Sequence, residues 1–455
     1  MKILLIDPPG CPKGLFGHRH YLRDWTGANF PGYIPFPPLD LMYAAAYLKG
    51  HGHKAKIIEA NAQHLRNEQI LKILQKEDPE FVLISSTYLT LKEDKMLAAF
   101  IRRSVPGVKI IFSGPLMTYN PSLALGDGSA DFVALGELEL PLLNILEGNY
   151  IENIAYLEQG NVIIGPRRLL DLRELPIPAR DLVDNQIYRY AFFNRRNPVT
   201  PMTITRGCPH SQCTFCHANL YTLGQLRFRD FDSVIEEIKE VVYRYKIREI
   251  FFRDQTFTAD REFIHRICDY LITHNIDILW RVQTRVDLVD KELLFLMRKA
   301  GCYQITFGFE SCSQAMLDII NKGIRLEQSR QAAKLAKRAG LEVLGLFIYG
   351  LPGDTIDSMR NILPFALELD LDFININEIF FFPGSIIYDA YSKKEGKIFP
   401  IEQLKSQVRR SYLKFYLRPA YLIRNFTRIG SFSGLNFLIR FSWNELVAHF
   451  GKSRY

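Results

Sequence analysis

Short apolar runs alternate with helical patterns along the first third of the chain. The apolar runs predict strands at 2–7, 54–59, 81–85, 109–112 and 131–135. Between them, apolar residues spaced three and four apart predict helices at 38–48, 68–75 and 91–103. Five strands with intervening helices favour a parallel, doubly wound sheet. In such a sheet, ligands lie beyond the carboxyl ends of the strands.

The same alternation of strand and helix patterns resumes from residue 201. It predicts strands at 202–205, 249–253, 279–284, 304–308, 342–349 and 373–379. It predicts helices at 231–244, 261–274, 291–300, 313–320, 326–339 and 356–369. Six β/α units indicate a partial TIM-like barrel, whose chemistry belongs at the carboxyl ends of its strands.

These patterns divide the chain into four parts. We expect an N-terminal Rossmann-like, flavodoxin-like domain at 1–150, a connector at 151–198, a partial (β/α)6 barrel at 199–390 and a helical segment at 391–455. The connector contains a proline-rich stretch at 170–181 that suits an extended link. Two or three domains are also what a length of 455 residues predicts.

Charge and cysteine content narrow the class of protein. The net charge is +8, and the segment 391–455 alone has 13 Lys and Arg against 3 Asp and Glu, so the basic character belongs to the tail. Seven cysteines, an odd number with only one tight cluster, do not form a disulfide framework and favour a reducing compartment. No apolar run reaches membrane-spanning length. We therefore expect a cytoplasmic protein.

The tight cluster is Cys208, Cys213 and Cys216, in a loop that follows the first strand of the barrel. Three thiolates in one loop suit a soft metal centre. A structural zinc site would need a fourth ligand, which His210 or His217 could supply. A 4Fe–4S cluster held by only three cysteines leaves one iron open, which makes it a reactive site. Chance clustering is the third possibility.

This loop resembles the cluster motif of the radical S-adenosylmethionine (radical SAM) enzymes. In that family three residues usually separate the first two cysteines, whereas here four residues, 209–212, separate Cys208 from Cys213. A surface loop absorbs one extra residue easily. The resemblance implies that the open iron binds the amino and carboxylate groups of SAM, and that SAM is cleaved to a 5′-deoxyadenosyl radical. It also implies that Phe215 packs near the adenine.

Three polar residues at the ends of later strands are candidate SAM ligands. Asp254 takes the place of the family's Gly-Gly-Glu motif and could accept from the SAM ammonium, or it could be a helix cap. Arg285 could pair with the SAM carboxylate or form a structural salt bridge. Glu310 lies in a Gly-Phe-Glu-Ser sequence that resembles the family's Gly-x-Glu-Ser element, in which the glutamate contacts SAM.

A glycine-rich segment at 345–355 resembles the family's Gly-x-Ile-x-Gly-x-Pro-Gly-Glu sequence, with Asp in place of Glu. The resemblance implies that Gly345, Gly350 and Pro352 form the wall against which the adenine lies. The missing side chains of glycine would let the base approach the backbone.

The order of segments in the N-terminal domain resembles the cobalamin-binding domain that precedes many radical SAM modules. The likeness includes the Pro-Pro-Leu-x-Leu start of the first helix and a Ser-Gly-Pro turn. The candidate cobalamin contacts at the strand ends are Ser85, Ser86, Gly114, Gly136 and Glu137. The chain has no Asp-x-His-x-x-Gly motif, so we expect cobalamin without a histidine ligand to cobalt. The alternative is a degenerate Rossmann-like domain without a cofactor.

Together, these resemblances imply a cobalamin-dependent radical SAM methyltransferase that acts on an unactivated carbon. One alternative is a cyclase, ring-rearranging or oxidative enzyme with the same cofactors but without methyl transfer. Another is a non-enzymatic cobalamin or iron–sulfur sensor. The expected partners are a small-molecule substrate and an electron donor such as flavodoxin or ferredoxin.

The basic C-terminal segment contains a Tyr-Leu-Arg-Pro sequence at 416–419 and suggests two interpretations. It is either a docked helical cap or a membrane-surface helix. The second would place the protein at the inner face of the membrane and suit a lipid-like substrate. No nucleic acid is expected, because no recognised binding module accompanies the charge.

Overall fold

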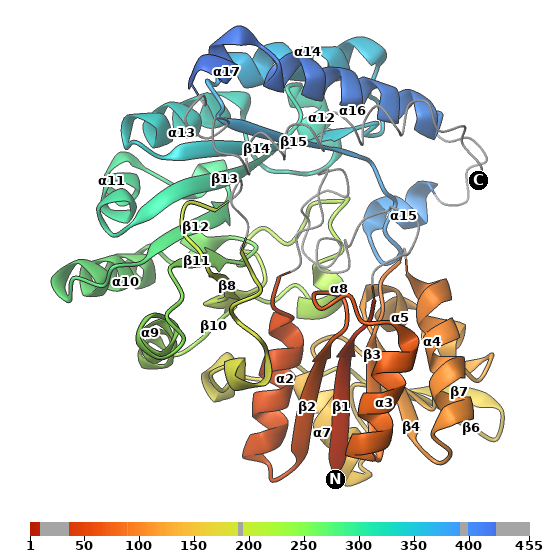
Figure 1. Ribbon diagram of the computed structural model, residues 1–455. Helices are drawn as coiled ribbons and strands as arrows, with labels where there is room; N and C mark the ends of the chain where they lie inside the picture. The colour runs from red at the N-terminus through yellow and green to blue at the C-terminus, as the bar shows by residue number, and fades with distance from the viewer. Residues whose placement is uncertain (10–35, 89, 190–193, 392–398, 425–455) are drawn as a thin grey trace.

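The computed structural model describes residues 1–9, 36–88, 90–189, 194–391 and 399–424 (Figure 1). Cys11 and the last part of the basic segment, 425–455, lie outside the described residues.

The N-terminal domain is built on a sheet whose first five strands are parallel. They run in the order β2-β1-β3-β4-β5, which is the flavodoxin-like order. The strands are β1 (Lys2–Asp7), β2 (Lys54–Glu59), β3 (Phe81–Ser85), β4 (Lys109–Ser113) and β5 (Phe132–Ala134). All five coincide with predicted strands, so the prediction of a doubly wound sheet is confirmed.

Helices cover both faces of this sheet. They are α2 (Leu39–Gly50), α3 (Asn67–Glu77), α4 (Leu91–Ser104), α5 (Pro115–Tyr119), α6 (Ser122–Leu125) and α7 (Glu139–Glu147). One apolar core lies between the sheet and helices α2 and α7, and a second lies between the sheet and helices α3 and α4. The buried strands are apolar on both faces because both faces are covered.

An antiparallel hairpin extends the first sheet beyond β5. It consists of β6 (Ile154–Glu158) and β7 (Asn161–Ile164), and it lies within the residues predicted to be a connector. The sheet therefore continues past residue 150. Between the hairpin and residue 198, the described residues contain only two short 3-10 turns, Leu172–Glu174 and Arg180–Leu182, as the proline-rich sequence there suggests.

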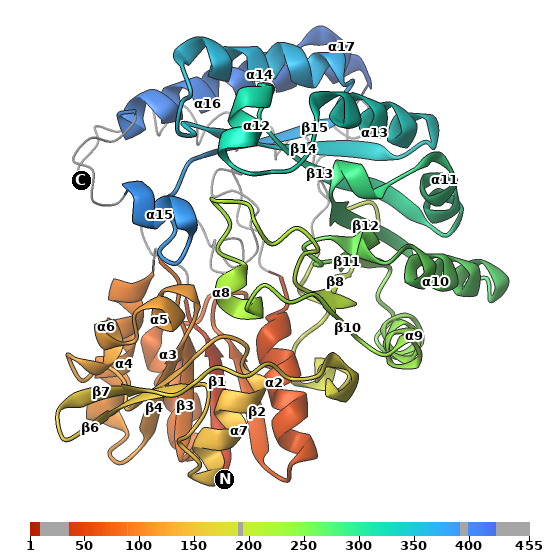
Figure 2. The same cartoon turned by 180° about the vertical axis from the view of Figure 1, so that it is seen from behind.

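The second sheet has six parallel strands in the order β15-β14-β13-β12-β11-β8. The strands are β8 (Val199–Met202), β11 (Glu249–Phe252), β12 (Leu279–Thr284), β13 (Cys302–Glu310), β14 (Glu342–Tyr349) and β15 (Phe373–Glu378). The helices are α9 (Phe231–Lys239), α10 (Arg261–Thr273), α11 (Lys291–Lys299), α12 (Gln314–Ile319), α13 (Leu326–Arg338) and α14 (Ile356–Glu368). The sheet curves without closing, and these helices lie on its outer side (Figures 1 and 2). The predicted partial barrel is confirmed.

Three short elements lie where the barrel meets the N-terminal domain. Strand β9 (Thr205–Arg206) pairs with β10 (Arg227–Phe228), and helix α8 (Asn219–Thr222) follows the cysteine loop. Figures 1 and 2 show α8 between the first domain and the inner side of the barrel sheet.

The described part of the C-terminal segment is a docked helical cap. After α15 (Ile386–Tyr391), helix α16 (Ile401–Tyr416) packs along β15, and α17 (Pro419–Arg424) follows. The Tyr412 hydroxyl accepts from the Ile376 amide at 2.9 Å, and the Tyr416 hydroxyl donates to the Ile374 carbonyl at 2.8 Å. Within the described residues, none of the helices combines the length and the apolar character needed to cross a bilayer.

Candidate active site

The cysteine loop leaves the barrel at a point fixed by a buried carboxylate. Asp254 follows β11, and its Oδ1 accepts from the amides of Ile204 at 2.9 Å and Thr205 at 2.5 Å, and from the Thr205 hydroxyl at 2.9 Å. Burial raises the pKa of Asp254 to about 6. Its second oxygen is also buried, but Asp254 is not among the residues that line the cysteine cavity. The described contacts therefore make Asp254 a support for the chain that enters the loop.

The three cysteines line one cavity of about 90 Å³. Burial raises the pKa of the Cys213 and Cys216 thiols, and Cys208 Sγ lies 3.2 Å from Thr256 Oγ1. Phe215, between two of the cysteines, is buried and lines the same cavity. The loop thus brings three thiols to one space, with an aromatic side chain beside them.

Charged side chains face the cysteines across this cavity. Lys322 Nζ lies 2.7 Å from Glu310 Oε1, and both side chains are 9% exposed. Although burial opposes the charge, the Glu310 carboxylate holds the pKa of Lys322 above its usual value. The Lys322 charge also acts on the thiol of Cys213, where it opposes the effect of burial. A buried cation near three thiolates offsets part of their mutual repulsion.

Arg285 also lines the cysteine cavity. Its Nε and Nη2 both donate to the Asp287 carboxylate at 2.9 Å, and Nη2 donates to the Lys322 carbonyl at 3.1 Å. The structure thus shows the structural salt bridge that was one of the two interpretations of Arg285. The same side chain remains at the cavity wall, beside Glu310.

The two histidines of the loop point to different surroundings. His210 Nε2 lies 2.7 Å from the Asn321 carbonyl oxygen. The His217 ring is 4.4 Å from the Phe382 ring, centroid to centroid, and burial lowers the pKa of His217 to about 4. Within the described ranges, no group of three or more Cys, His, Asp or Glu side chains is close enough to hold a single metal ion. The thiolates of a 4Fe–4S cluster each bind a different iron and are spaced more widely.

The three residues predicted to form the adenine wall are not among those that line the cysteine cavity. A Cβ on Gly345 would meet Leu371, Phe347 and Phe309 within 3.0 Å, and these side chains belong to the apolar core. The cavity is lined instead by Leu346, the next residue of β14. This difference arises because successive side chains of a strand point to opposite faces.

Gly350 and Pro352 lie in the loop after β14. Gly350 has φ +84° and packs against Leu404 of α16, and its amide and that of Leu351 each donate to Asp354 Oδ2 at 3.0 Å. Pro352 is buried in the same loop. Neither residue is among those that line the cysteine cavity.

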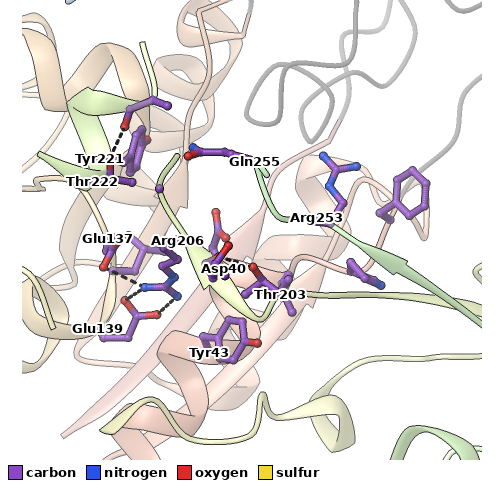
Figure 3. Close-up of a pocket in the computed structure, with 18 of the residues that line it drawn as sticks. Asp40, Tyr43, Glu137, Glu139, Thr203, Arg206, Tyr221, Thr222, Arg253 and Gln255 are labelled. Carbon is purple, nitrogen blue, oxygen red and sulfur yellow. Dashed lines mark hydrogen bonds and ion pairs between the residues drawn. The ribbon is translucent and has the colours of Figure 1, made fainter. Parts of the chain in front are cut away.

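A second cavity, of about 160 Å³, lies between the two domains and adjoins the first (Figure 3). Three residues, Ala218, Gln255 and Gln283, line both cavities. The N-terminal domain contributes Phe36, Pro37, Leu39, Asp40, Tyr43, Gly136, Glu137, Leu138 and Glu139 to its lining. A ligand on the edge of the first domain and a ligand at the cysteines would therefore reach a common space.

Ion pairs join the domains beside this cavity. Arg206, two residues before the first cysteine, makes two bonds to Glu139, at 2.7 and 3.1 Å, and lies 3.0 Å from Glu137. Glu137 also pairs with Arg227 of β10. Figure 3 shows the Arg206 guanidinium directed at both carboxylates. Glu137, predicted as a cobalamin contact, thus lies at the cavity and is held by two arginines.

The other predicted cobalamin residues lie at the same edge of the first sheet. Ser85 and Ser86 are buried, and the Ser86 hydroxyl donates to Asp94 at 2.8 Å. Gly114 has φ +124°, and a Cβ there would lie 2.0 Å from the Ser86 carbonyl oxygen. Only glycine permits this close approach of two loops.

Gly136 has a similar constraint, with φ +77°. A Cβ there would lie 2.4 Å from Nη2 of Arg167, whose guanidinium crosses to the carbonyls of Leu220 and Tyr221 in α8. Gly136 therefore lines the interdomain cavity and also leaves room for an arginine that joins the two domains.

Four residues of these two cavities were not predicted from the sequence: Lys322, Gln255, Arg206 and Glu139. Gln255 follows Asp254 directly, so its position at the end of a barrel strand could have identified it as a candidate site residue. Lys322 lies in an Asn-Lys-Gly turn after α12, and nothing in that local pattern distinguishes it from a solvated lysine. The partners of Arg206 come from another domain, where sequence spacing carries no information.

Comparison with known families matches both domains. The model of the radical SAM superfamily matches residues 202–366, and the B12 binding domain matches residues 31–146. The first range contains the three cysteines, and the second contains strands β2 to β5 of the flavodoxin-like sheet.

Relatives match over almost the whole chain. An uncharacterized methyltransferase of Pyrococcus horikoshii is 31% identical, over 93% of this chain and 94% of the relative. The anaerobic magnesium-protoporphyrin IX monomethyl ester cyclase of Rubrivivax gelatinosus is 25% identical, over 91% of this chain and 79% of the relative.

A solved structure shows the same two-domain fold. The cobalamin-dependent S-adenosylmethionine radical enzyme OxsB, with aqua-cobalamin bound, superposes with a TM-score of 0.68 at 18% identity. The match covers 87% of this chain and 56% of OxsB, so the chain spans little more than half the length of that protein.

Proposed function

The chain belongs to the cobalamin-binding radical SAM enzymes, and on this basis we propose that it transfers a methyl group to an unactivated carbon of a small molecule. The observation that carries the proposal is the adjacency of the two cavities. One is lined by the three cysteines and the other by the edge of the B12-binding domain, and they share Gln255 and Gln283. The methyltransferase among the relatives supports methyl transfer as the reaction.

The residues at the cysteines fit the cofactors of this family. We propose that Cys208, Cys213 and Cys216 hold three irons of a 4Fe–4S cluster, each as a thiolate. We assign Arg285 and Glu310 to SAM, because a guanidinium matches a carboxylate and a carboxylate accepts from an ammonium. When bound, the cluster with SAM supplies a 5′-deoxyadenosyl radical that removes a substrate hydrogen atom, and cobalamin supplies the methyl group.

The remaining residues bind, orient and exclude water. Phe215 covers the cysteine cavity with an apolar surface, which suits the wall beside an adenine. Gln255 and Gln283 stand between the two cavities, where their amides can orient a substrate through hydrogen bonds. At the B12-binding edge, Gly136 and Glu137 line the shared space. No histidine from an Asp-x-His-x-x-Gly motif is present in the sequence, so we propose that cobalamin binds without one.

We also propose an electron donor of the flavodoxin or ferredoxin type. Peripheral membrane contact and a lipid-like substrate remain predictions that rest on the basic segment. The described residues of that segment, 399–424, form the helical cap, and residues 425–455 lie outside the described residues.

The test is anaerobic reconstitution with iron, sulfide and cobalamin, followed by addition of a reductant and SAM labelled in its methyl group. Mass spectrometry should detect 5′-deoxyadenosine, and a labelled methyl group in the product once a substrate is supplied. Cys213→Ala should abolish 5′-deoxyadenosine formation. Cys312→Ala is the matched control, because Cys312 is a half-buried cysteine outside the loop. Normal 5′-deoxyadenosine formation by Cys213→Ala would refute the cluster assignment.

A second candidate function is radical chemistry without methyl transfer. The cyclase among the relatives favours it, since that protein is 25% identical over 91% of this chain. The labelled methyl group separates the two candidates. Release of 5′-deoxyadenosine with a changed product that carries no label would establish the second candidate and exclude the first.

A further inference from the structure

The arc between the first two cysteines, residues 209–212, is one residue longer than is usual in the family, and side chains hold it in place. His210 Nε2 lies 2.7 Å from the Asn321 carbonyl oxygen. Because a carbonyl oxygen can only accept, Nε2 carries the proton of this bond. In return, Asn321 Nδ2 donates to the Gln212 carbonyl at 3.2 Å. On its other side, the arc receives a bond from Asn219 to the Ser211 carbonyl.

The partner of the arc is the loop between α12 and α13, residues 320–325. Ile320 accepts through its carbonyl from the Thr214 amide at 2.9 Å, directly beside Cys213. Gly323 has φ +67°, and a Cβ there would lie 2.7 Å from His210 Cε1. The His210 ring therefore lies against the backbone of this loop, at a distance that only glycine allows.

The same loop also reaches the cysteine cavity. Lys322, between the two residues that contact His210, directs its Nζ to Glu310 at 2.7 Å. Its carbonyl accepts from Arg285 Nη2 at 3.1 Å. One short stretch of backbone thus connects the extra-long arc on one side with both proposed SAM ligands on the other.

We propose that His210 is a positioning residue, which fixes Cys208 and Cys213 relative to Glu310 and Arg285 through the α12–α13 loop. The longer arc has more conformational freedom than a shorter one, and the hydrogen bond from His210 to Asn321 restricts this freedom. The inference rests on the proposed cluster, because it concerns the placement of the cluster ligands. It assigns a role to a histidine that, on the sequence alone, was a candidate zinc ligand.

The test compares His210→Ala with His210→Gln, which places an amide donor at a similar reach. The matched control is His274→Ala, since His274 is an exposed histidine at the C-terminal end of the outer helix α10, and its Nδ1 lies 2.9 Å from the Tyr270 carbonyl oxygen. Each protein is reconstituted with iron and sulfide. The measurements are the rate of iron loss to a chelator and the electron paramagnetic resonance spectrum of the reduced cluster with and without SAM. Circular dichroism of the apoprotein reports folding.

We expect His210→Ala to lose iron about fivefold faster than wild type, because the loss of one typical hydrogen bond changes an equilibrium by about that factor. We also expect a weaker spectral change when SAM is added. His210→Gln should restore both properties, and His274→Ala should match wild type. Equal behaviour of His210→Ala and His274→Ala would overturn the proposal, as would a failure of His210→Gln to restore either property. A wild-type protein that binds no cluster would instead overturn the proposed function and this inference together.

A second pair of variants tests the contact between Gly323 and the His210 ring. Gly323→Ala should accelerate iron loss in the wild-type background, because its Cβ meets the His210 ring. In the His210→Gly background the ring is absent, so the same substitution should have a smaller effect. Equal effects in both backgrounds would show that the ring contact is not what holds the arc.

Discussion

Replacing Glu139 with Gln should weaken the junction between the cysteine loop and the B12-binding domain. Glu139 is 1% exposed and bonds to both terminal nitrogens of Arg206, which is 14% exposed. Burial alone would lower the pKa of Arg206, and the carboxylates of Glu139 and Glu137 hold it well above its usual value. The substitution keeps the shape of the side chain, removes its charge and places an amide donor against a guanidinium donor.

The size of the effect follows from what remains around the arginine. Removing one partner of a buried ion pair costs about 3–5 kcal/mol when the other charge is left alone. Here Glu137 stays 3.0 Å from Arg206, so we expect about 2 kcal/mol for Glu139→Gln. The double variant with Glu137→Gln leaves Arg206 without either carboxylate, and it should be destabilised by the full amount of about 3–5 kcal/mol.

The assay is urea unfolding of the apoprotein, followed by circular dichroism. Glu292→Gln is the matched control, because Glu292 forms a similar ion pair, at 2.6 Å to Arg261, but is 75% exposed. It should produce no measurable change. If Glu139→Gln and Glu292→Gln have the same unfolding midpoint as wild type, the ion pair does not contribute to the junction and the reasoning is refuted.

Three further predictions concern other parts of the site. Burial raises the pKa of Asp254 to about 6, so the protonated form of Asp254 favours the folded state. Wild type should therefore lose stability relative to Asp254→Asn as the pH rises from about 4 to 7. Urea unfolding at each pH measures the difference in stability, and a difference that is constant with pH would contradict the prediction. Lys322→Met and Glu310→Leu should each destabilise the protein by about 3 kcal/mol, because each leaves the charge of the other residue buried. The double variant should cost less than the sum of the two single variants. Additive costs, measured by thermal unfolding of the four proteins, would exclude coupling between Lys322 and Glu310. Gly114→Ala should abolish stable folding of the B12-binding domain, since its Cβ would lie 2.0 Å from a carbonyl oxygen. Gly107→Ala, with φ +87° and nothing within 4 Å, should cost only about 1 kcal/mol. Equal yields of the two folded variants would show that the space around Gly114 does not require glycine.

The order of elements could be predicted because it depends on local patterns. Strand β14, at Glu342–Tyr349, agrees with its predicted range at both ends, and helix α13 ends at Arg338, one residue before its predicted end. Both elements have a complete apolar face, and flanking glycines mark their limits. The hairpin β6–β7 was not predicted, because its exposed strands lack such a face and gain their position by pairing with β5.

The cysteine loop could also be predicted, because its three cysteines lie close together in the sequence. Cys208, Cys213 and Cys216 line one cavity together with Phe215. For Gly345, the motif located the strand but did not indicate the face on which the residue lies. That face depends on the register of β14 in the sheet and on where Leu371 packs.

By itself, the sequence determined the two domains, the three-cysteine loop and the polar residues at the strand ends, because periodicity and short-range spacing are properties of neighbouring residues. The tertiary structure alone decided that Lys322 reaches the cysteine cavity, that Arg206 pairs with Glu139, and that His210 meets Asn321. Arg206 and Glu139 are 67 positions apart in the sequence, and His210 and Asn321 are 111 positions apart. Lys322 and Glu310 are only 12 positions apart, but they come from different elements. Their partners are set by how the domains and loops pack, and no local pattern records that packing.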